Sequence, residues 1–142
     1  MIYALILQFI VWQIFAALMG YLEAILFHLA DYYRLKSFNK DYRDIHFHFT
    51  IIRFAMYIML FMHLGARNVI VFTPVAICTF SFMHDGIYYL MRNKLSPGVY
   101  SKGFFDKPSI GSTAKAKMSF KHRAIAFAFG LVLWCLLITY IY

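Results

Sequence analysis

Three charged residues stand inside otherwise apolar stretches of the sequence: Glu23, Arg53 and Asp85. On the helices that these stretches predict, each charge lies roughly 10–12 Å inside one common end, because a helix rises about 1.5 Å per residue. An isolated charge at such a depth in a membrane costs about 2.5–3.5 kcal/mol, so such residues normally face one another and pair. We therefore expect Arg53 to bridge Glu23 and Asp85 in an ion cluster, which is either a clamp between helices or a functional site.

Histidines gather near the same helix ends as these charges. Five of the six are His28, His46, His48, His84 and His122. Neutral imidazole together with carboxylate is a usual ligand set for zinc or non-haem iron. The candidate metal ligands are therefore His28, Asp31, His48 and His84, and the candidate metals are zinc and iron. The sequence contains neither His-Glu-x-x-His nor Cys-x-x-Cys, so no local zinc motif supports this site.

Two further sets of residues could act together on a lipid. His84 and Asp85 are adjacent and form a candidate catalytic acid–base pair. The candidate lipid-headgroup ligands are basic and follow the third apolar stretch: Lys115, Lys117, Lys121 and Arg123. Each basic residue near a membrane surface contributes about 1 kcal/mol to the attraction of anionic lipid. The sequence therefore predicts that anionic membrane lipids are partners, whether or not a reaction takes place.

The composition places these residues in a membrane protein. Of the 142 residues, 63% are apolar, 20% are aromatic and 14% are charged, whereas soluble domains are nearer to half apolar and a quarter charged. Such a chain lacks the polar surface that a disordered protein or a soluble nucleic-acid binder needs. We therefore expect no nucleic-acid partner, although the net charge is +8.

The distribution of the charges predicts the helices. Formal charges are absent from 2–22, 54–66, 68–84 and 124–142, and a transmembrane helix needs about 20 mostly apolar residues. If the second and third helices each accept one buried charge, four spans result, at about 2–30, 45–65, 68–91 and 123–142. The fold predicted is an all-α integral membrane protein, a small antiparallel four-helix bundle that forms one domain over 1–142.

The basic residues predict how this bundle is oriented. Of the 14 Lys and Arg residues, twelve lie in or next to two segments, the one between the first two spans and the one at 92–122. The positive-inside rule places such segments on the cytoplasmic or matrix side. We therefore expect the basic third loop, 92–122, on the inner face of a bacterial or organellar inner membrane, with both termini on the outer side.

Three classes of function fit these features. The first is a non-catalytic subunit or assembly component of a larger membrane complex, which binds protein partners or further copies of itself within the membrane. The second is an enzyme that acts on a lipid-type substrate at the inner face, by a metal or by acid–base catalysis. The third is an oligomeric, holin-like pore. We rank the first ahead, because no strong catalytic motif occurs in the sequence.

Overall fold

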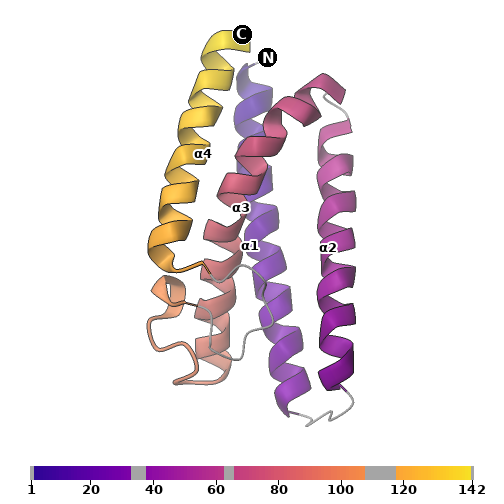
Figure 1. Cartoon of the computed structure of the whole chain (residues 1–142), viewed down its shortest axis with the longest axis vertical. Coiled ribbons are helices and arrows are strands. Elements are labelled where there is room, and N and C mark those ends of the chain that lie inside the picture. The colour runs from indigo at the N-terminus through magenta and orange to yellow at the C-terminus, as the bar shows by residue number, and fades with distance from the viewer. Residues whose placement is uncertain (1, 33–37, 63–65, 108–117, 142) are drawn as a thin grey trace.

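The computed structural model describes residues 2–32, 38–62, 66–107 and 118–141. These residues form α1 (Ile2–Tyr32), α2 (Phe38–Met62), α3 (Ala66–Leu95), the short 3-10 helix η1 (Gly103–Phe105) and α4 (Phe120–Ile141), without a strand. Successive α-helices run in opposite directions, and the two termini lie at the same end of the bundle (Figure 1). The prediction of an all-α bundle of four antiparallel helices is confirmed.

Three of the four helices are long and apolar enough to cross a membrane. Their apolar stretches are Leu5–Leu29 in α1, Val69–Leu95 in α3 and Phe120–Tyr140 in α4. A span of about 20 residues covers roughly 30 Å of hydrocarbon at 1.5 Å per residue. The length and composition of these three helices therefore indicate an integral membrane protein.

The second helix differs from the span predicted at 45–65. α2 begins at Phe38 and ends at Met62, and its first two turns contain Lys40, Asp41, Arg43 and Asp44. Among its residues with described side chains, the apolar stretch is Phe47–Met59, and the helix continues through the apolar residues 60–62. Over the described residues, α2 is not among the three helices that are long and apolar enough to cross a membrane.

The third loop is shorter than the predicted segment 92–122. α3 continues to Leu95 and keeps Arg92 and Lys94 in its last turn, where the helix dipole favours cations. At the other end of the loop, α4 begins at Phe120. Ser119 precedes it and caps it, because its Oγ accepts a hydrogen bond from the His122 backbone N–H (3.5 Å).

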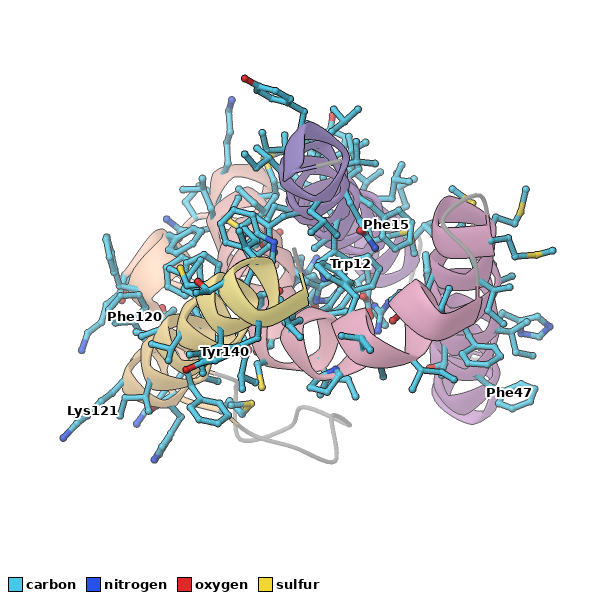
Figure 2. The ribbon with its side chains drawn as sticks, turned by 90° about the horizontal axis from the view of Figure 1, so that it is seen from above. Trp12, Phe15, Phe47, Phe120, Lys121 and Tyr140 are labelled. Atoms are coloured by element: carbon cyan, nitrogen blue, oxygen red, sulfur yellow. The ribbon has the colours of Figure 1, made fainter. Side chains whose placement is uncertain are left out.

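The core forms where α1 and α2 meet α3. Its buried members are mostly aromatic and aliphatic: Trp12, Phe15, Met19, Phe49, Tyr57, Phe72, Val75 and Ala76. Seen from above, Trp12 and Phe15 lie between the helices, whereas Phe47 points away from the bundle on α2 (Figure 2). α1 packs along α3, and α4 packs on another face of α3, while α2 makes fewer contacts with either neighbour. α3 is therefore the central helix.

Two glycines let the central helix approach its neighbours closely. A Cβ at Gly20 of α1 would overlap the His84 carbonyl oxygen of α3, and a Cβ at Gly86 would overlap the ring of Phe104 in η1. The first glycine brings α1 against α3 one turn before Glu23. The second lets η1 cover the lower end of α3. Both close approaches therefore lie near the level of the polar side chains.

The upper part of α3 bends near Pro74 (Figure 1). Proline removes one backbone donor from a helix and commonly kinks it. Side chains from both neighbours bind α3 carbonyls around this point. Trp12 Nε1 donates to Ala76 O at 3.2 Å, and the Tyr57 hydroxyl donates to Val69 O at 3.0 Å. These two bonds join the upper halves of α1 and α2 to the bent helix.

Candidate functional site

The polar side chains of three helices meet in one ion cluster, made of Glu23, Arg53, His84 and Asp85. Arg53 Nη2 on α2 donates to Glu23 Oε2 on α1 at 2.5 Å. His84 of α3 lies against the same carboxylate, with Nε2 2.8 Å from Oε2. Glu23 is only 3% exposed. One buried carboxylate therefore binds α2 and α3 to α1.

His84 lies at the centre of this cluster and contacts each of the other members. Its Nδ1 is 2.7 Å from Asp85 Oδ1, and its Nε2 is 2.8 Å from Arg53 Nη2. A neutral imidazole can accept a hydrogen bond from Arg53 through Nε2, and an imidazolium can donate one to Glu23. In both forms Nδ1–H donates to Asp85. The Asp85 carboxylate therefore orients the ring whatever its protonation state.

The cluster differs in one contact from the predicted arrangement, in which Arg53 bridges Glu23 and Asp85. Arg53 does contact Glu23, but Asp85 contacts His84. Adjacent residues point about 100° apart around a helix, so Asp85 is turned away from the side on which His84 meets Arg53. Asp85 lies instead near enough to Arg123 of α4 for their opposite charges to attract.

Arg123, a predicted headgroup ligand, is buried and holds the loop before α4. Its Nη2 donates to the carbonyl oxygens of Phe104 and Asp106, both at 2.9 Å, and its guanidinium lies 5.2 Å from the centre of the Tyr89 ring. The side chain is 0% exposed. Because α4 begins at Phe120, this residue lies inside the first turns of the helix and under η1, so it is not available to a lipid headgroup.

The other three predicted headgroup ligands are lysines, and the structure describes the position of one of them. Lys121 is exposed at the start of α4, and Figure 2 shows its side chain pointing away from the bundle. Lys115 and Lys117 lie outside the described residues. Of the four predicted ligands, Lys121 is thus the one whose described position suits a headgroup.

The candidate metal ligands have separate neighbours. His28 Nδ1 is 2.9 Å from Ser96 Oγ at the lower end of α3, while His48 is exposed on α2 with its ring edge-on to Phe47. His84 belongs to the ion cluster, and the side chain of Asp31 lies outside the described part. Within the described ranges, no group of three or more His, Cys, Asp or Glu side chains is arranged to hold a metal ion. The expected convergence of the histidines is therefore not found there.

The cluster can fix helices more readily than it can catalyse. A catalytic imidazole needs one nitrogen oriented and the other free to exchange a proton with the substrate. Asp85 orients Nδ1 of His84, but Nε2 faces Glu23 and Arg53, and the histidine is 7% exposed. A substrate would have to displace one of these charged partners. The observed contacts fix α1, α2 and α3 at one position relative to one another along their axes.

Sequence reasoning missed the link between His84 and Glu23, which is the centre of the cluster. Gly20 gives a signal for it, because it stands three residues before Glu23 and therefore on the same side of α1. Small residues of this kind let membrane helices approach closely. A polar residue one turn from such a glycine can be expected to reach the neighbouring helix.

Comparison with known proteins gives no relative of this chain. No family model, no curated protein and no solved structure matches it. The ion cluster and the buried Arg123 are thus the features on which a role can be argued.

We predict that Glu23 and Arg53 stabilise the fold as a pair. Removing one partner of a buried ion pair leaves the other charge uncompensated, which costs about 3–5 kcal/mol. Glu23→Leu and Arg53→Leu should each lower the free energy of unfolding in detergent micelles by that order. The double variant should lose about 1–3 kcal/mol less unfolding free energy than the sum of the two single losses. Phe54→Leu, at the exposed neighbour of Arg53, is the control, and strictly additive losses would contradict the pairing.

We predict a contrast between two basic residues that are two positions apart in α4. Arg123→Gln should lower the free energy of unfolding by about 1–3 kcal/mol, because the carbonyls of Phe104 and Asp106 lose a buried donor. Lys121→Gln, at an exposed position, should change it by no more than about 0.5 kcal/mol. Thermal and denaturant unfolding of the purified variants measures both values. Equal effects of the two substitutions would show that the buried guanidinium does not hold the loop.

Proposed function

We propose that the chain is a non-catalytic component of a larger membrane assembly, and that α2 presents the surface that binds the rest of it. The observation that carries the proposal is the outward side of α2. We call this the α2 outer face, and its large exposed apolar side chains are Phe47, Ile51, Ile52, Phe54, Met56, Met59 and Met62. Phenylalanine and methionine are enriched at protein interfaces, and methionine adapts to irregular partners.

The packing of α2 favours a partner on this face. α2 makes fewer contacts with α1 and α3 than α1 and α4 make with α3, so much of its surface is left uncovered by the chain itself. A neighbouring protein that covers the α2 outer face would bury these apolar side chains.

The ion cluster supports the same role. Each of its four side chains has a polar partner within the chain, so α2 is held against α1 and α3 at one register. The further inward contacts of α2 come from Phe49 and Tyr57, which are both buried. A surface fixed in this way loses little conformational entropy when a partner binds.

We further propose that the ion cluster marks the edge of the membrane on the basic side. Glu23, Arg53, His84 and Arg123 belong to different helices but lie at one level through the contacts described above. From this level toward the termini, the runs 2–22, 54–66, 68–84 and 124–142 contain no formal charge, and Arg67 lies between the second and the third. The first run rises by roughly 30 Å, the thickness of the hydrocarbon. The cluster would then lie at the boundary, which is shallower than the depth expected from sequence.

The basic residues would lie beyond this edge. Exposed lysines on this side are Lys94, Lys102, Lys107 and Lys121. By the positive-inside rule, this side faces the cytoplasm or the matrix, as in a bacterial or organellar inner membrane. The termini, at the opposite end of the bundle (Figure 1), would then face outward.

A second candidate function is an enzyme that uses His84 and Asp85 on a lipid-type substrate. The observation that favours it is the 2.7 Å contact between His84 Nδ1 and Asp85 Oδ1, because a carboxylate at this position orients a catalytic imidazole. His84 would act as the base through Nε2 after a substrate group displaced Arg53 or Glu23. No step is assigned to a metal, because the described histidines do not converge on one site.

The assembly proposal predicts that the α2 outer face controls the size of the complex. After extraction in mild detergent, native electrophoresis should show the chain in a species larger than its own monomer. Phe54→Gln should shift it to the monomer without changing its melting temperature. Phe129→Gln, at a comparably exposed phenylalanine of α4, should not. A monomer in the unsubstituted extract, together with turnover of membrane lipid that Asp85→Asn abolishes, would favour the enzyme instead.

A further inference from the structure

An apolar groove runs along one side of α1, with α3 at its base. Its described lining comes from these two helices, and includes Phe9, Ile14, Ala17 and Tyr21 of α1 and Met83 and Ile87 of α3. The groove has a volume of about 430 Å³, which lies in the range of small-molecule sites, about 300–1,000 Å³. Neither the ion cluster nor the α2 outer face contributes to it. It is therefore a separate feature that the proposed assembly does not use.

The groove has the length of one leaflet of a bilayer. From Phe9 to Tyr21, α1 rises by roughly 18 Å at 1.5 Å per residue, and half of the hydrocarbon thickness is about 15 Å. Its lower end lies at the level of the ion cluster, because Tyr21 is two residues from Glu23 and Ile87 is two residues from Asp85. The groove thus begins at the proposed membrane edge and ends near the middle of the bilayer.

η1 packs on α3 near this lower end. A Cβ at Gly86 would overlap Phe104, and a Cβ at Gly103 would lie 3.3 Å from Leu90 Cδ1, so η1 covers the face of α3 that is next to Ile87. Lys102 immediately precedes η1 and is exposed. The nearby carboxylate of Asp106 accepts hydrogen bonds from the backbone N–H groups of Lys102 and Lys107. The lysine ammonium groups remain on the surface, where an anionic headgroup can meet them.

We propose that the groove binds one acyl chain of an anionic phospholipid from the leaflet on the basic side, with the phosphate near Lys102. The apolar lining suits the chain, the length suits one leaflet, and the charge at the lower end suits the headgroup. The site rests on the proposed membrane edge but not on the assembly, because the groove lies on α1 and α3 and the partner surface lies on α2. A monomeric protein would bind the same lipid.

Trp134 provides a probe at the upper end of the groove. Its ring stacks on Phe9, with 4.7 Å between the centroids. The chain has two tryptophans, so Trp12→Phe leaves Trp134 as the single fluorophore. The purified protein is placed in phosphatidylcholine vesicles that contain a small fraction of lipid brominated on the distal half of one acyl chain. The brominated lipid is either phosphatidylglycerol or phosphatidylcholine, and bromine quenches the fluorescence only on contact.

Brominated phosphatidylglycerol should quench Trp134 at an about fivefold lower fraction than brominated phosphatidylcholine, because one basic contact contributes about 1 kcal/mol. Ala17→Phe fills the groove and should abolish the difference, whereas Ala55→Phe, at an exposed position of α2, should preserve it. Lys102→Gln should reduce it. If Trp12→Phe fails to fold, the unsubstituted protein allows the same comparison, because Trp12 is only 5% exposed.

Two results would overturn the proposal. Equal quenching by the two brominated lipids would mean that the groove is covered by unselected bilayer lipid. A difference that survives Ala17→Phe, in a variant with an unchanged melting temperature, would place the anionic lipid elsewhere on the protein. Neither result depends on the size of the native complex, so failure of this site and failure of the proposed assembly can be told apart.

Discussion

The arrangement of the helices depends on the carboxylate of Glu23, which Arg53 and His84 share. A buried charge near hydrocarbon has to be paired, and the pairing fixes the helices that supply its partners. Here the partners come from α2 and α3, and His84 extends the contact to Asp85. Asp85 in turn is close enough to Arg123 for their opposite charges to attract, and Arg123 holds the η1 segment. One buried acid is therefore connected, directly or through neighbours, to every helix of the bundle.

This polar level divides the molecule into two parts with different tasks. Toward the termini, the helices are apolar and suited to the bilayer, and the groove between α1 and α3 lies in this part. On the other side, the exposed lysines, η1 and the charged start of α2 suit the headgroup layer and water. The α2 outer face lies across this division, with Phe47 before Arg53 and Phe54, Met59 and Met62 after it.

The sequence predicts the helices well, because absence of charge over a long run has one physical explanation in a chain this apolar. It predicts their contacts less well. The number of residues between two charges gives their depth but not the direction in which each side chain points, so Asp85 was expected opposite Arg53 although His84 stands there. The sequence predicts Arg123 as the first residue of the last span, whereas α4 begins three residues earlier, at Phe120, and the side chain lies under η1. The histidines share a depth, but shared depth brings residues from separate helices together only when their faces coincide.

The claim that the ion cluster marks the membrane edge can be tested on one face of α1. Leu18 and Leu29 are both exposed and lie on opposite sides of the Glu23 level. In a background in which the free cysteines Cys78 and Cys135 are replaced by alanine, Leu18→Cys and Leu29→Cys are treated with a membrane-impermeant maleimide in vesicles opened to both sides. The account predicts that the variant at position 29 is labelled and that the variant at position 18 is protected. Protection of both would place the cluster deep in the hydrocarbon and contradict the account.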